Sequence, residues 1–142
     1  MYQGLRNKAV INYDAAEKLN QTPNYHYCSS IHCAYFSCFQ ILKFIILAIF
    51  NEDEEEVYAK RKTGTREIGE HDYYIQRIHE HILSTKDYGS AKDFKNKIIE
   101  LKSLRTVSDY KIDTIEQNKS EYAIRLADEI LKILRKNFNY DK

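Results

Sequence analysis

The sequence predicts an all-α protein, an up-and-down helical bundle of about five helices with one long apolar helix at its centre. Glycine and proline are scarce, at 4 and 1 residues in a chain of 142, whereas folds built from strands and turns use many of both. Apolar residues recur at helical spacing along most of the chain. Hydrophobic residues make up 43% and charged residues 30%, which indicates one folded domain spanning 1–142.

The first two helices are predicted from spacing and capping. An apolar period indicates a helix near residues 4–20. Thr22 and Pro23 then resemble a helix start, with an N-cap followed by proline at the first helical position. This second helix should extend to about Phe50, and because it carries two adjacent apolar stripes it should be buried on most sides. Its apolar run, ILKFIILAIF, contains a lysine and is about half the roughly 20 residues that span a bilayer, which favours a core helix.

The rest of the chain divides at charged and glycine-containing segments. Residues 51–69 are first acidic and then basic and have no apolar period, so we expect a charged flexible loop there. A third helix should begin near Glu70. Gly89-Ser90 should close one element and cap a fourth helix, which runs toward Tyr110. A fifth helix should follow from about Asp113.

Composition narrows the classes of function. The formal net charge of +1 gives no general attraction to nucleic acid or membranes, so such binding would need a local patch. The three cysteines share no helical face and indicate small buried side chains in a reducing, cytoplasmic compartment, without disulfides. The first residues lack the apolar core of a secretory signal. The sequence contains no glycine-rich phosphate loop, GxSxG or HExxH, and we expect neither a cofactor nor a metal.

The fourth helix carries the main candidate for a functional residue. Arg105 falls within the apolar stripe that includes Phe94 and Ile98. An unpaired buried charge is costly, and Asp109, one turn later, is placed to pair with it. Lys102 borders the same stripe. Spacing alone favours a structural salt bridge, and a binding groove is the alternative.

Three segments resemble motifs of the HEPN domains, a family of small helical proteins. Residues 34–40, AYFSCFQ, are similar to the family's "aYYAmFh" helix. Residues 104–110, LRTVSDY, are similar to its "LR…aDY" motif. His71 resembles the histidine that often opens the third helix. The order and lengths of the helices agree as well, so the resemblance spans most of the chain.

The resemblance implies both a fold and a function. HEPN proteins are helical bundles that commonly dimerise, and many are metal-independent ribonucleases or toxins paired with a nucleotidyltransferase-like antitoxin. The nuclease members place a histidine shortly after the arginine, where it can take a ribose proton while the arginine stabilises phosphate charge. In this chain Tyr110, Lys111 and Ile112 occupy those positions. The resemblance is therefore to a branch without the nuclease histidine, and it implies a non-catalytic, homodimeric module that binds a nucleotide, an RNA or a protein partner.

The same resemblance implies a site. Its residues would be Arg105, Asp109, Tyr110, Lys102, His71 and Tyr35. The alternative is a ribonuclease toxin in which Arg105 acts with a displaced histidine such as His71. The spacing from Arg66 to His71 also matches the nuclease pattern, and we interpret that match as chance. A two-fold homodimer is expected on a further ground, since the second helix has more apolar faces than its neighbours should cover.

Overall fold

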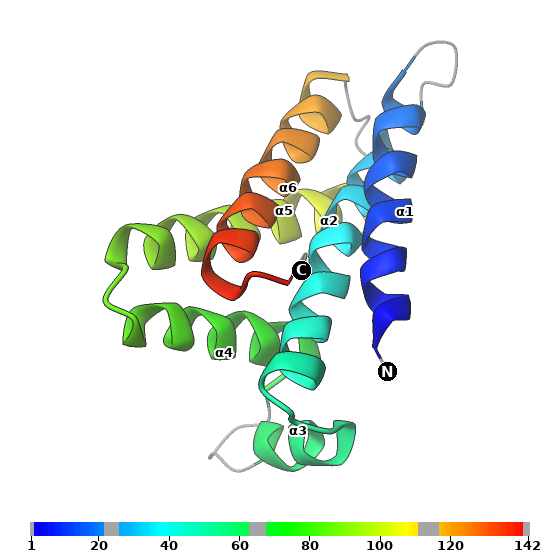
Figure 1. The fold of residues 1–142 in the computed structure, drawn as a ribbon. Helices are drawn as coiled ribbons and strands as arrows, with labels where there is room; N and C mark the ends of the chain where they lie inside the picture. The colour runs from blue at the N-terminus through cyan, green and yellow to red at the C-terminus, as the bar shows by residue number, and fades with distance from the viewer. Residues whose placement is uncertain (1, 22–25, 63–67, 111–116, 141–142) are drawn as a thin grey trace.

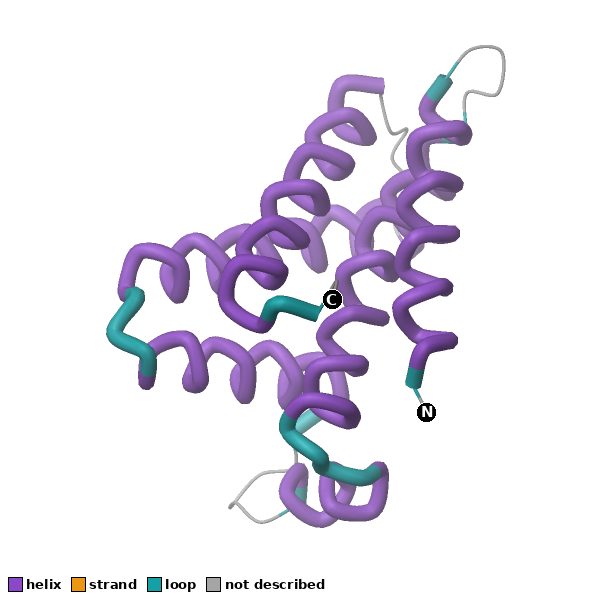
Figure 2. Tube along the Cα trace, in the orientation of Figure 1, coloured by secondary structure: helices purple, strands orange, loops and turns teal. Residues whose placement is uncertain are grey.

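The computed structural model of the chain describes residues 2–21, 26–62, 68–110 and 117–140. Within these ranges the chain forms helices and no strand (Figures 1 and 2). The elements are α1 (Gln3–Asn20), α2 (Tyr27–Phe44), the π-helix η1 (Ile45–Ile49), α3 (Glu54–Arg61), α4 (Glu70–Ser84), α5 (Tyr88–Tyr110) and α6 (Gln117–Phe138). The prediction of an all-α bundle is confirmed.

The helix α2 lies at the centre of the bundle. It packs against α1, α4, α5 and α6, and α1 runs beside it in the opposite direction (Figure 1). Ile31, Tyr35 and Leu42 of α2 are fully enclosed by these neighbours. The chain itself therefore covers most of the apolar side chains of α2, whereas Phe36 and Phe44 remain partly exposed. The homodimer expected from the apolar faces of this helix and from the family resemblance stays a prediction.

Burial also bears on whether α2 could enter a membrane. Among the described residues one segment, Tyr27–Ile49, is long and apolar enough to cross a bilayer by length and composition. In the fold, 61% of its most apolar stretch is buried against the rest of the chain. That burial is typical of the core helix of a soluble protein.

The end of α2 departs from regular helix. The last turn, Ile45–Ile49, is π-helical, and the amide of Phe50 donates to the carbonyl of Ile45 at 2.9 Å. Asn51 follows with a φ of 55°, a left-handed conformation that asparagine tolerates better than most residues. The helical run thus ends where the sequence predicts, near Phe50. The predicted start at Thr22 and Pro23 lies outside the described residues.

Part of the segment predicted as a loop, 51–69, is helical. The helix α3 begins after Asp53, whose carboxylate accepts a hydrogen bond from the amide of Glu56 at 2.7 Å. Three glutamates in the first turn interact favourably with the helix dipole. Val57 is buried, so the segment does contribute to the core. A capped helix, rather than an irregular loop, therefore follows α2.

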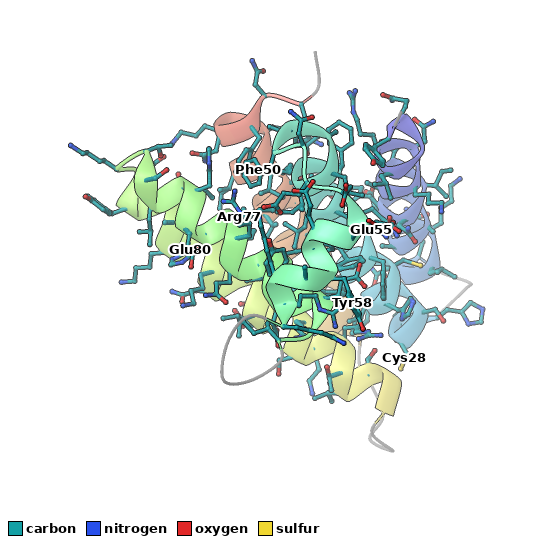
Figure 3. All side chains as sticks on the ribbon, turned by 90° about the horizontal axis from the view of Figure 1, so that it is seen from below. Cys28, Phe50, Glu55, Tyr58, Arg77 and Glu80 are labelled. Carbon is teal, nitrogen blue, oxygen red and sulfur yellow. The ribbon has the colours of Figure 1, made fainter. Side chains whose placement is uncertain are left out.

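A buried carboxylate connects this segment to α4. Glu52 is 4% exposed, and it accepts hydrogen bonds from Lys60 at 2.6 Å, Tyr73 at 3.0 Å and Arg77 at 3.3 Å. The Arg77 guanidinium also lies 4.6 Å from the centroid of the Phe50 ring (Figure 3). Two residues of α4 are thereby held against the segment that follows α2.

The helices α4 and α5 pack side by side and complete the bundle. The start of α4 at Glu70 agrees with the sequence prediction. The turn before α5 does not, because Gly89 and Ser90 already belong to the first turn of α5. The side chain of Asp87 accepts a hydrogen bond from the Ser90 amide at 3.2 Å and caps the helix in their place. His71 in the first turn of α4 and Arg105 of α5 both lie near the middle of α2, beside Tyr35.

Candidate functional site

The middle of α2 supplies the aromatic part of the site. Tyr35 is fully buried, and Phe39 lies one turn further along the same face. The ring of Phe36 meets that of Tyr35 edge to face, with the centroids 5.3 Å apart. Three neighbouring aromatic rings of α2 thus face the junction with α4 and α5.

His71, in the first turn of α4, packs onto these rings. Its imidazole stacks on Phe39 with centroids 4.0 Å apart and an interplanar angle of 21°. Its Nδ1 atom lies 2.6 Å from the phenolic oxygen of Tyr35. Burial lowers the pKa of His71 below its usual value, and the positive charges of Lys102 and Arg105 lower it further. The imidazole is therefore neutral at pH 7.

The burial of Tyr35 decides which ring nitrogen of His71 carries the hydrogen. Burial raises the pKa of Tyr35, so its hydroxyl stays protonated and needs an acceptor. Among the described residues, the only acceptor for that hydroxyl is Nδ1 of His71. We infer that the hydroxyl donates to Nδ1 and that the hydrogen of the neutral imidazole is on Nε2. His71 is then left with an N–H donor to offer a ligand.

The cationic part of the site comes from α5. The Arg105 guanidinium lies 5.1 Å from the ring centroid of Phe36 and 5.6 Å from that of Tyr35, within the range of cation–π contacts. One turn earlier, Lys102 forms an ion pair of 2.6 Å with Asp72 of α4. Arg105 is half-buried, as its place on the apolar stripe predicts.

The structure brings together four of the six residues that the resemblance implies. These are Tyr35, His71, Lys102 and Arg105. Asp109 and Tyr110 belong to the last turn of α5, but their side chains lie outside the described part of the structure, so the predicted pair of Arg105 with Asp109 is not tested. Arg66 lies outside the described residues too.

Sequence reasoning missed three contributors to the site. Phe36 and Phe39 follow Tyr35 in the segment AYFSCFQ, and both rings lie beside the ring of Tyr35. Asp72, which directly follows His71, carried no signal because its partner Lys102 is 30 residues away.

The assembled groups define what the site can do chemically. A guanidinium, an ammonium and an imidazole N–H are all hydrogen-bond donors, and two of them are charged. Such a set binds an anion with several acceptor oxygens, such as a phosphate group. In the part of the chain that the structure describes, no three His, Cys, Asp or Glu side chains gather as metal ligands would.

Comparison of the chain with protein-family models, with curated proteins and with solved structures finds no match. The HEPN resemblance therefore rests on the sequence alone, on its three motifs and on the order and lengths of its predicted helices.

Proposed function

We propose that this chain is a HEPN-like, non-catalytic module that binds the phosphate of a nucleotide or an RNA between α2, α4 and α5. The observation that carries the proposal is the meeting of His71 and Arg105, which are distant in sequence, over the aromatic rings of α2. Lys102 adds a second positive charge from the same helix as Arg105.

The state of His71 supports binding rather than catalysis. A general base must offer an unprotonated nitrogen to the proton that it removes. In the tautomer inferred for His71, the unprotonated nitrogen is Nδ1, which lies 2.6 Å from the Tyr35 hydroxyl and accepts its hydrogen. The other nitrogen carries a hydrogen and can donate to a phosphate oxygen. An imidazole in this tautomer is suited to hold an anion.

The alternative is a metal-independent ribonuclease toxin. One observation favours it, because the displaced histidine that it requires, His71, does lie in the same cluster as Arg105. Catalysis would require the imidazole hydrogen to move from Nε2 to Nδ1, so that Nε2 could accept the proton of a ribose hydroxyl.

The proposed assembly follows the family resemblance. We propose a cytoplasmic homodimer whose protein partner, where it has one, is a nucleotidyltransferase-like antitoxin. Light scattering at micromolar concentration tests the dimer directly, and a monomer would contradict it.

The binding experiment uses the full chain and a fluorescein-labelled single-stranded RNA, with mononucleotides as competitors. Arg105→Ala should weaken binding by about tenfold or more, because it removes a charged hydrogen-bond donor. Affinity should also fall with rising salt. The matched control is Arg125→Ala on α6, whose guanidinium also packs on a tyrosine ring, that of Tyr122 at 5.6 Å. The control should bind as the wild type does.

The outcomes separate the two functions. Cleavage of the RNA in EDTA by the wild type, lost in both Arg105→Ala and His71→Ala, would establish the ribonuclease alternative. Absence of binding by the wild type, or an equal loss in Arg125→Ala, would contradict a phosphate site at Arg105.

A further inference from the structure

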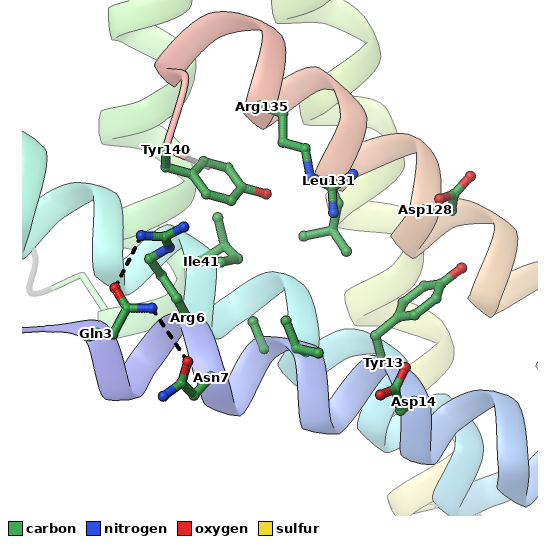
Figure 4. Close-up of a pocket in the computed structure, with 12 residues that line it drawn as sticks. Gln3, Arg6, Asn7, Tyr13, Asp14, Ile41, Asp128, Leu131, Arg135 and Tyr140 are labelled. Carbon is green, nitrogen blue, oxygen red and sulfur yellow. Dashed lines mark hydrogen bonds between the residues drawn. The ribbon is translucent and has the colours of Figure 1, made fainter. Parts of the chain in front are cut away.

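A cavity of about 230 Å³ lies between α1, α2 and α6, and none of the residues of the candidate site lines it (Figure 4). The buried side chains of Ala9, Ile41 and Leu131 form apolar parts of its wall. Gln3 and Asn7 add side-chain amides from the first two turns of α1. The cavity is thus apolar inside and polar at its edge, as small-molecule sites usually are.

The charges around this cavity are separated by sign. Along α1, Arg6 comes before Asp14, and along α6, Asp128 comes before Arg135. The two helices run in opposite directions (Figure 1), so the two arginines lie toward one end and the two aspartates toward the other (Figure 4). The cavity therefore has a cationic end and an anionic end.

Each end also carries a phenol. Tyr140 lies toward the arginines, and Tyr13 lies toward the aspartates (Figure 4). Burial raises the pKa of Tyr13, the nearby Asp128 raises it further, and Arg135 lowers it. The pKa of Tyr13, which lines the cavity, is thus influenced by the charges at both ends.

The distance between the ends limits the size of the ligand. At the helical rise of about 1.5 Å per residue, Arg6 and Asp14 are about 12 Å apart along α1. Asp128 and Arg135 are about 10 Å apart along α6. A free amino acid has its ammonium and carboxylate on the same carbon and cannot reach both ends. An extended peptide spans roughly 3.3–3.6 Å per residue, so about three residues match the separation.

We propose that this cavity binds the zwitterion of a short peptide of about three residues. The peptide carboxylate lies at Arg6 and Arg135, and the ammonium lies at the aspartates. An apolar side chain of the peptide packs against the wall at Ile41, and the peptide amides meet the side-chain amides of α1.

The ligand ammonium can replace the present ion-pair partner of Asp128. Asp128 pairs with Lys132 at 2.9 Å, one turn along the same helix, and the Lys132 side chain is 68% exposed. An exposed pair of this kind stabilises the fold only weakly, so a ligand ammonium can compete for the carboxylate at little cost. The proposal does not depend on the phosphate site, since it uses none of the same residues.

The test titrates the isotope-labelled full chain with the peptide Ala-Leu-Ala and follows amide NMR shifts. The free peptide should bind with saturable shifts in α1 and α6. Its N-acetyl and C-amide forms, which each lack one charge, should bind about tenfold more weakly or worse. L-leucine, which cannot reach both ends, should bind no better than the blocked peptides.

Matched variants locate the two charges. Arg135→Gln should weaken Ala-Leu-Ala but leave the C-amide form unchanged, and the neighbouring Lys136→Gln serves as its control. Asp128→Asn should weaken Ala-Leu-Ala but leave the N-acetyl form unchanged, with Glu129→Gln as its control. Lys136 and Glu129 do not line the cavity.

Three results would overturn the proposal. One is the absence of saturable shifts with Ala-Leu-Ala, and another is equal affinity for the free and blocked peptides. The third is equal weakening by a variant and its control. The blocked peptides are compared on the wild-type chain, so that comparison does not depend on the folding of any variant.

Discussion

Glu52→Gln should destabilise the fold by about 2–3 kcal/mol at pH 7. The carboxylate is 4% exposed and accepts three hydrogen bonds, two of them from the charged Lys60 and Arg77. A hydrogen bond to a charged group contributes about 1.5–3 kcal/mol to stability. We take the low end of this range for each of the two charged bonds, because the side chains of Lys60 and Arg77 are 49% and 34% exposed and therefore screened by water. Glutamine keeps one acceptor oxygen, which can retain the bond from Tyr73.

The same hydrogen bonds predict how the stability difference between the wild type and Glu52→Gln depends on pH. Burial alone would raise the pKa of Glu52, but the hydrogen bonds, with that from Lys60 the largest, outweigh burial and lower the pKa. A carboxyl group with a lowered pKa stabilises the fold fully above its unfolded value of about 4.3 and loses this contribution as the pH falls through the folded value. The gap between the wild type and Glu52→Gln should therefore close below about pH 4.

Urea unfolding followed by circular dichroism at pH 7 and at about pH 3 measures both effects. Glu55→Gln is the control, because Glu55 is exposed in the first turn of α3 and interacts mainly with the helix dipole, worth about 0.3–1 kcal/mol. A change below about 0.5 kcal/mol for Glu52→Gln at pH 7 would refute the reasoning, since that is the range of surface substitutions. A gap that persisted unchanged in acid would refute the role of its charge.

Three further predictions concern other parts of the fold. The pKa of His71, followed by NMR, should lie below its usual value of about 6.5 and rise toward it in Lys102→Ala, because a nearby positive charge is removed. A thiol reagent should modify the exposed Cys28 in the native state, whereas Cys38, buried and with its pKa raised to about 12, should react only after unfolding. Leu42→Ala should lower the free energy of unfolding by about 2–5 kcal/mol, measured in urea, because Leu42 is fully enclosed.

The helices that the sequence predicts correctly are those with a long apolar period. The helix α4, for example, buries Tyr74, Ile75, Ile78 and Ile82 on one face. The helix α3 was not predicted, because only Val57 of its eight residues is buried and a single buried residue gives no apolar period. The helix is stabilised by the cap at Asp53 and by the hydrogen bonds of Glu52. The partners of Glu52 on α4 are more than 20 residues away in sequence, so a local pattern does not reveal them.

The cysteines show the same limit of sequence reasoning. Cys38 is buried, as its apolar surroundings predict, and no disulfide links the three thiols. Cys28 is exposed, against the prediction. It lies in the first turn of α2, where its carbonyl accepts a hydrogen bond from Ser108 of α5 but its side chain faces solvent. Burial by other helices cannot be deduced from local sequence.

Within the candidate site, sequence identified residues that break a local pattern. Arg105 stood out because a charge interrupts an apolar stripe, and the structure places it half-buried against aromatic rings. The pairing of Lys102 with Asp72 could not be predicted, because it depends on how α4 and α5 pack. The hydrogen bond from Tyr35 to His71 joins residues 36 apart and likewise becomes visible only in three dimensions.

That hydrogen bond leads to the prediction that best separates binding from catalysis. Long-range ¹H–¹⁵N NMR spectra distinguish the two nitrogens of an imidazole and report which one carries the hydrogen. In the wild type the hydrogen of His71 should be on Nε2, because the buried hydroxyl of Tyr35 donates to Nδ1. Tyr35→Phe removes that donor, so the preference for one tautomer should weaken, while stacking on Phe39 still holds the ring. A wild-type imidazole with its hydrogen on Nδ1 would leave Nε2 free to accept a proton, and it would favour the ribonuclease over the binding module.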